Sequence, residues 1–230
     1  RDRRRLPRKR PEVEVPVVHS HSAPDDSRAT ANELETTESG GGETPAHMSE
    51  HPRWNVAVSV REEGYNPARR LLREFGVVGR TGYFNLLLLR VDDRAAFLDA
   101  FSRAVAADPA ILELQISRVV PAEETFSFQS PEEFEERARE IAAGWAGRLA
   151  GSRFHVRLHR RGFRGRLSSQ DEERFLDHVL LDALERIGEA GWITFEDPDA
   201  ILSVETVSNW AGMSLWTRDE LTRYPFVRLD

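Results

Sequence analysis

The sequence contains no cysteine, and its only lysine is Lys9, so arginine supplies nearly all of its positive charge. Without thiols the chain cannot form disulfides or thiolate metal sites, a composition that fits a reducing cytoplasm. No apolar run approaches the roughly 20 residues that a membrane helix needs. The basic N-terminal residues are not followed by the apolar segment of a signal peptide. We therefore expect a cytoplasmic protein that does not contact a membrane.

The chain also lacks an excess of positive charge. Its 32 basic residues stand against 39 acidic ones, and the formal net charge at pH 7 is −7. Non-specific binding of nucleic acid needs a broad basic surface, because the release of counterions from the phosphates drives it. This balance argues against a DNA-binding protein and is compatible with a small basic face on an acidic body.

Motifs that carry catalysis or bind nucleotide cofactors are missing from the sequence as well. There is no G-x-x-x-x-G-K-[ST] loop and no nucleophile elbow. Glu196, Asp197 and Asp199 cluster around Pro198, where turn chemistry explains them better than a metal or catalytic site does. We therefore predict no catalytic residues, no metal and no cofactor, and hence no enzymatic activity.

Residues 1–51 differ from the rest of the chain in composition. A basic cluster that ends at Arg10 is followed by a stretch rich in Pro, Ser, Thr and Glu. Such a segment buries too little apolar surface to offset its ordering entropy, so we expect a disordered tail, either an auxiliary RNA-binding arm or dispensable. The chain does not begin with Met, and Met48 stands just before the first periodic segment. A natural start at Met48, with residues 1–47 non-native, is therefore an open alternative.

The remaining chain is predicted to form two domains of mixed α+β class. Residues 52–128 show the order strand, helix, hairpin, helix, strand, which is typical of a ferredoxin-like domain. Asn66 before Pro67 is a helix-start pattern, and Asp93 opens the second helix. Residues 129–230 are predicted to form an α/β domain with capping boxes at Ser130 and Ser169. Its remaining strands and segments are expected at 154–159, 192–195, 201–207, 213–216 and 225–229.

The most informative stretch has the sequence FHVRLHRRGFRGR and runs from Phe154 to Arg166. Its first part alternates like a strand, with Phe154, Val156 and Leu158 on one face and polar side chains on the other. It then becomes a turn of arginines, glycines and one aromatic ring, without an acid. Arginine suits bidentate phosphate contacts and stacking on bases, so we predict an RNA-binding surface, with plainly solvated arginines as the alternative.

The second domain resembles the THUMP domain, an RNA-binding module of tRNA-modifying proteins. FHVRLHRRG resembles the module's first strand with its basic exit, and the helix from Ser169 to Ile187 matches in place and length. PDAILSVETV and the following Met213–Leu215 resemble the module's later strands. The resemblance covers residues 130–230, and the preceding unit resembles, more weakly, the ferredoxin-like domain that precedes THUMP in these proteins.

The resemblance implies that the chain binds tRNA. In the family, THUMP usually delivers a tRNA, often through its acceptor end, to an attached catalytic domain. Two small domains use up the length of this chain, so the implied type is a stand-alone adaptor that presents tRNA to a separate modifying enzyme, such as an acetyltransferase. Together the pattern and the resemblance assign RNA contacts to Arg157, Arg160, Arg161, Phe163, Arg164 and Arg166.

His155 and His159 complete this set, either as RNA contacts or as plain surface histidines. Two other hypotheses for the function stay open. The chain is a fragment or a divergent member of a THUMP-containing methyltransferase, thiouridine synthetase or pseudouridine synthase, or it is a protein-interaction module whose basic turn contacts an acidic partner.

Overall fold

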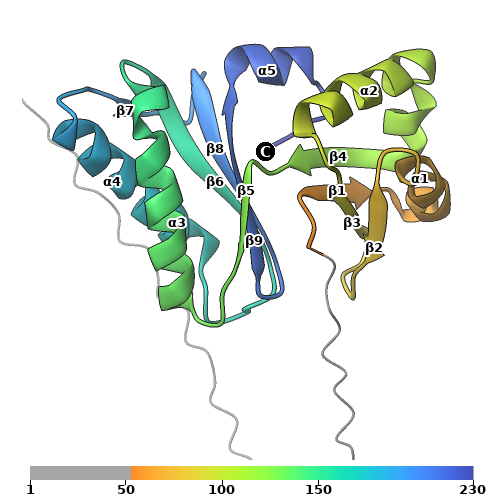
Figure 1. The fold of residues 1–230 in the computed structure, drawn as a ribbon, viewed down its shortest axis with the longest axis horizontal. Helices are drawn as coiled ribbons and strands as arrows, with labels where there is room; N and C mark the ends of the chain where they lie inside the picture. The colour runs from red at the N-terminus through yellow and green to blue at the C-terminus, as the bar shows by residue number, and fades with distance from the viewer. Residues whose placement is uncertain (1–52, 230) are drawn as a thin grey trace, which may run out of the picture. The chain divides into compact units, whose positions relative to one another are not determined.

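The computed structural model describes residues 53–229 of the protein. The predicted tail and the question of a start at Met48 lie outside the described residues. The described part contains two β-sheets with helices packed on them (Figure 1), so the predicted mixed class is confirmed. Within it, no helix is long and apolar enough to cross a membrane.

The first sheet is antiparallel and has the strand order β2-β3-β1-β4. Its strands are β1 (Val56–Val60), β2 (Val77–Arg80), β3 (Leu86–Arg90) and β4 (Ile116–Pro121). Helices α1 (Tyr65–Leu72) and α2 (Arg94–Ala107) connect them, so the element order is the one that the sequence predicts. Asp93 caps α2 as predicted, because its side chain accepts a hydrogen bond of 3.0 Å from the backbone N–H of Ala96.

The second sheet is mixed and has the strand order β5-β9-β8-β6-β7. Its strands are β5 (Glu124–Ser127), β6 (Arg153–Arg161), β7 (Trp192–Ile193), β8 (Ala200–Val207) and β9 (Trp210–Thr217). β6 runs parallel to β7 and β8, and the other pairs are antiparallel. Helices α3 (Pro131–Trp145) and α4 (Ser169–Arg186) lie on one side of this sheet, and α5 (Arg218–Arg223) follows β9 (Figure 1).

The other face of the second sheet is covered too. Val207 of β8 packs in a cluster with Trp54, Ala57, Leu86 and Leu88, which belong to the first sheet and its approach. Further along the same face, Ile201 of β8 and Trp216 of β9 join the core between the first sheet and its helices, together with Phe226 of the C-terminal segment. Both faces of the second sheet are therefore buried, one under α3 and α4 and the other under the first sheet and the C-terminal segment.

Several element boundaries differ from the predictions. The last strand of the first unit, which the sequence predicts over residues 111–120, begins only at Ile116, and Ile111–Gln115 form a π-helix before it. The start of α1 is preceded by a 3-10 turn (Glu62–Gly64), and Asn66 lies inside the helix rather than capping it. The cap of α4 is Ser168 rather than Ser169. A further 3-10 turn, Ala146–Leu149, follows α3.

The division between the domains stays a prediction, but the strand pairing bears on it. β5 lies within the predicted first domain, and it pairs with β9 at the edge of the second sheet. In the opposite direction, the end of the chain returns to the first sheet. The backbone N–H of Val119 in β4 donates a hydrogen bond of 3.0 Å to the carbonyl of Phe226.

Candidate nucleic-acid interface

β6, the predicted RNA-binding strand, alternates as its sequence indicates. Phe154, Val156 and Leu158 are buried under α3 and α4. Since β7 pairs only with the first two residues of β6, the backbone beyond Phe154 forms an open edge. Two carboxylates of α4 accept hydrogen bonds from the backbone N–H groups of that edge: Asp177 from Val156 (3.0 Å) and Glu173 from Leu158 (2.8 Å).

The polar face of β6 points into the protein rather than to solvent. His155 is 2% exposed, its ring centroid lies 5.1 Å from that of Phe195, and its Nδ1 donates to the carbonyl of Thr194 at 2.8 Å. Arg157, the next residue on this face, is half-buried. The burial of His155 leaves its ring no surface for a ligand, so we do not carry it into the proposed interface.

His159 is the third member of that polar face. Its Nε2 donates a hydrogen bond of 3.1 Å to the backbone carbonyl of Leu229. Burial lowers the pKa of His159, and the nearby Glu205 carboxylate offsets part of that effect. The imidazole is therefore neutral at neutral pH and holds the C-terminal segment, a role that does not suit a phosphate contact.

Arg161 belongs to a buried ion network. Its Nη1 lies 2.9 Å from Glu205 Oε2, and its Nη2 donates to Ser59 Oγ at 3.2 Å. The other oxygen of Glu205 accepts from Arg118, whose Nε donates to the carbonyl of Arg228. The Glu205 side chain is 2% exposed, and those of Arg118 and Arg161 are 10% and 23% exposed. These contacts join β6 and β8 to the first sheet.

This network was not predicted, although the sequence carries one signal of it. Glu205 is the one ionisable residue in the otherwise uncharged stretch ILSVETV of β8. A carboxylate at such a position is almost always buried with a cation. Nothing in the sequence indicates that the cations are Arg118 and Arg161, which lie far from it in the chain.

The turn after β6 is fixed by a close contact with the β2–β3 loop. Gly162 has φ +107°, and a Cβ atom placed on it would lie 2.9 Å from Tyr83 Oη and 3.0 Å from Ser208 Cα. Tyr83 Oη and Ser208 Oγ are 3.3 Å apart, within hydrogen-bond reach. Glycine is needed here because the backbone approaches other parts of the protein too closely for a side chain.

The exposed cations of the predicted RNA-binding set lie within residues 160–166, which we call the arginine turn. Arg164 and Arg166 are exposed, and Arg160 is half-buried, with its guanidinium donating to the carbonyl of Gly162. The ring of Phe163 packs 4.8 Å from that of Phe128, and the Arg166 guanidinium lies 5.0 Å from the Phe163 ring centroid. Among the described residues, no carboxylate forms an ion pair with any of these three arginines.

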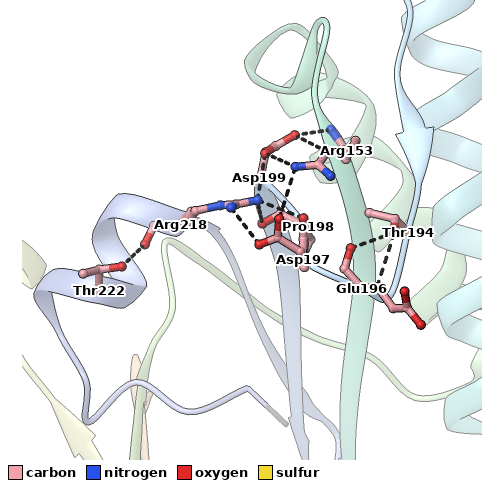
Figure 2. A network of polar contacts seen from close by, with 8 residues as sticks. All are labelled: Arg153, Thr194, Glu196, Asp197, Pro198, Asp199, Arg218 and Thr222. Atoms are coloured by element: carbon pink, nitrogen blue, oxygen red, sulfur yellow. Dashed lines mark hydrogen bonds and ion pairs between the residues drawn. The ribbon is translucent and has the colours of Figure 1, made fainter.

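The acidic cluster around Pro198 is engaged with arginines, as Figure 2 shows. Asp199 accepts from Arg153 Nε (3.1 Å) and from Arg218 Nη2 (3.0 Å), and Arg218 also pairs with Asp197 at 2.7 Å. The hydrogen bonds from Arg153 lower the pKa of Asp199 to about 2. These contacts tie the starts of β6 and β8 to α5, in agreement with the structural explanation of the acids.

Comparisons with known proteins add a relationship of fold. No family model and no curated protein matches the sequence. PH1313 from Pyrococcus horikoshii Ot3 is 13% identical with a TM-score of 0.50, over 70% of this chain and 53% of that chain. TrmN from Thermus thermophilus is also 13% identical with a TM-score of 0.50, over 70% of this chain and 44% of that chain.

A 4-thiouridine synthetase, solved in a complex with RNA and bound ATP, gives a lower TM-score of 0.45. It is 15% identical, over 71% of this chain and 42% of that chain. The chain thus spans about half the length of the structures that it matches, and at these identities the likeness shows the fold alone.

One prediction from the sequence is contradicted by these comparisons, namely that the protein is not an enzyme. The two structures matched with a TM-score of 0.50 extend well beyond the aligned part, which makes up 53% and 44% of those chains. Missing motifs in this chain therefore do not argue against a part in catalysis, and we withdraw the prediction. What the likeness supports is a THUMP-like α/β fold, over the 70% of the chain that aligns.

Proposed function

We propose that this chain binds tRNA and holds it for chemical modification, as the RNA-binding part of a tRNA-modifying enzyme. The arginine turn is the observation that carries the proposal. Arg164 and Arg166 are exposed and Arg160 is half-buried, and within the described residues none of them is paired with an acid. Guanidinium groups in this state are suited to bidentate contacts with phosphate oxygens.

The turn is held in place by contacts with both sheets, which favours binding. Gly162 packs against Tyr83 and Ser208, and Phe163 packs against Phe128. A rigid turn loses little conformational entropy when it binds a ligand. Because the whole protein carries a net charge of −7, phosphate is attracted only at local basic sites such as this turn. Such a charge distribution suits selective binding of one RNA better than non-specific binding of nucleic acid.

Of the residues predicted to contact RNA, we propose Arg160, Arg164 and Arg166 as the phosphate contacts. The ring of Phe163 packs beneath the guanidinium of Arg166 and helps to hold the turn. Arg161 and His159 act through structure, by holding the first sheet and the C-terminal segment. We also keep as proposals the ferredoxin-like assignment of the first unit, the boundaries 52–128 and 129–230, and a cytoplasmic location, where tRNA is found.

Binding of tRNA and of a DNA duplex, measured by fluorescence anisotropy at several salt concentrations, tests the proposal. We expect the triple variant Arg160→Ala, Arg164→Ala and Arg166→Ala to bind tRNA about tenfold or more weakly, with a salt slope flatter by about one unit per lost phosphate contact. A control variant of equal charge change, with Ala in place of the exposed Arg70, Arg73 and Arg103, should bind as the wild type does. Equal losses in the two variants, or equal affinity for DNA, would remove the arginine turn as the binding site.

A second assay addresses which enzyme modifies the tRNA that this chain is proposed to bind. The resemblance to THUMP proteins implies a partner such as a methyltransferase, thiouridine synthetase or acetyltransferase. Incubation of tRNA with the protein and each donor, with and without such an enzyme, followed by mass spectrometry of the nucleosides, shows which component modifies the RNA.

A further inference from the structure

We propose that Phe84, in the β2–β3 loop, stacks on an unpaired nucleobase of the RNA that the arginine turn holds. The inference rests on the proposed function and extends the RNA site from the second sheet to the first. The site would then join two chemistries that recognise RNA, guanidinium groups for the phosphates and an aromatic ring for a base.

Phe84 has an unusual environment for an aromatic side chain. It is 79% exposed, more than any other large hydrophobic side chain in the described residues. It belongs to none of the hydrophobic clusters, although the neighbouring Tyr83 packs against one. Exposure of a phenyl ring to water forgoes the stabilisation of about 1.5–3 kcal/mol that burial would bring. An exposed ring offers a flat face on which a nucleobase can stack.

The loop that carries Phe84 is internally bonded. Thr81 Oγ1 accepts from the N–H of Tyr83 at 3.1 Å and lies 3.2 Å from the carbonyl of Leu86, to which it can donate. Asn85 has φ +54°, a left-handed conformation that Asn tolerates better than most residues. With Tyr83 directed to Ser208, the loop presents Phe84 from a fixed backbone, as a stacking platform requires.

Phe84 also lies close to the arginine turn. Tyr83 Oη is the atom that a Cβ on Gly162 would meet at 2.9 Å, and Gly162 lies in the middle of the turn. The Tyr83 side chain and one Cα step of about 3.8 Å lie between Gly162 and the backbone of Phe84, so the two backbones are separated by a distance on the order of 10 Å. An RNA strand whose phosphates contact Arg164 and Arg166 can therefore place a neighbouring base at Phe84.

A shallow hollow beside Phe84 has the lining that a base needs. Its volume is about 380 Å³, and its aromatic wall is formed by Tyr65, Tyr83 and Phe84. Its polar groups are Glu62, Thr81 and Asn85. The carboxylate of Glu62 repels phosphate, whereas it can accept a hydrogen bond from the amino group of a base. The hollow is therefore suited to a base rather than to the RNA backbone.

An RNA hairpin with a short unpaired 3′ extension, compared with the same hairpin with a blunt end, tests the inference. We expect Phe84→Ala to weaken binding of the extended hairpin about five- to a hundredfold, the range that loss of one base stack predicts, and to leave the blunt hairpin unaffected. Phe84→Trp should retain the affinity. The exposed Val77 provides a control, because Val77→Ala removes apolar surface on β2, away from the loop.

The outcomes separate this inference from the proposed function. If the triple arginine variant loses RNA binding while Phe84→Ala binds both hairpins normally, the stacking inference is wrong and the proposed function stands. If Phe84→Ala weakens both hairpins equally, Phe84 does not recognise an unpaired base, and the inference is likewise wrong. If the triple arginine variant binds as the wild type does, the proposed function fails. Unchanged melting temperatures show that each variant is folded.

Discussion

Arg161 and Arg164 are three residues apart in the same basic stretch, and the structure predicts opposite consequences when each is replaced by alanine. Arg161 is bound to the buried Glu205 and to Ser59, whereas Arg164 is exposed. We therefore expect Arg161→Ala to lower the stability of the protein, and Arg164→Ala to lower its affinity for RNA without a change in stability.

The magnitude follows from the contacts. Breaking a buried ion pair by removal of one partner costs about 3–5 kcal/mol, because the other charge is left in the interior. In Arg161→Ala the carboxylate of Glu205 keeps Arg118, and the Arg161 side chain is partly exposed, so we expect a smaller loss of about 1–3 kcal/mol. Glu205→Gln deprives both arginines of their acid and should cost about 3–5 kcal/mol. Arg164→Ala should stay within about 0.5 kcal/mol of the wild type.

Urea unfolding followed by tryptophan fluorescence measures these differences, since Trp54 and Trp216 are buried. In thermal melts each kcal/mol corresponds to a shift of about 2–4 °C for a protein of this size. The reasoning is refuted if Arg161→Ala unfolds as the wild type does and weakens RNA binding as much as Arg164→Ala. Arg161 would then be a phosphate contact, and the ion network would not hold the sheets together.

Two further predictions concern α4 and the arginine turn. Burial, with the nearby Glu135 and Asp171, raises the pKa of Glu172 from 4.5 to about 7. The free energy of unfolding should therefore fall as the pH rises from 4.5 to about 7, because the folded protein holds the proton more tightly than the unfolded chain does. In unfolding titrations above pH 7, the Glu172→Gln variant should be more stable than the wild type by up to about 3 kcal/mol, and below pH 4.5 the two should differ little. Gly162→Ala should cost about 1–3 kcal/mol through its positive φ and its collision with neighbouring atoms. The control Gly144→Ala, in open space within α3, should instead be neutral or stabilising by about 0.5–1 kcal/mol, and a destabilised control would point to a general intolerance of alanine.

Most of the fold could be predicted from local sequence patterns. The alternation of β6 and the caps at Asp93 and Ser130 were predicted from a few neighbouring residues, because side-chain direction and cap hydrogen bonds are local properties. The short elements β5 and α5 were not predicted. β5 has four residues and pairs with a strand that follows it by more than 80 residues, so no local pattern specifies it.

The candidate site could be predicted only in part, for a similar reason. Alternation shows that His155, His159 and Arg161 share a face of β6, but it does not show what covers that face. In the structure the segment after β7 covers His155, the C-terminal segment contacts His159 and the first sheet contacts Arg161. The expected RNA surface is therefore a polar internal contact. The exposed aromatic ring of Phe84 was missed because it lies in the first domain, far along the chain from the arginines.

Ultraviolet crosslinking of the protein to tRNA, with the crosslinked peptides identified by mass spectrometry, tests the central claim most directly. A protease that cleaves after acidic residues keeps the arginine turn within one peptide, because residues 160–166 contain no acid. We predict that crosslinks fall on the peptide that contains Phe163, Arg164 and Arg166. Crosslinks confined to other surfaces, such as the exposed side chains around Trp192 and Phe195, with none in the arginine turn, would contradict the account.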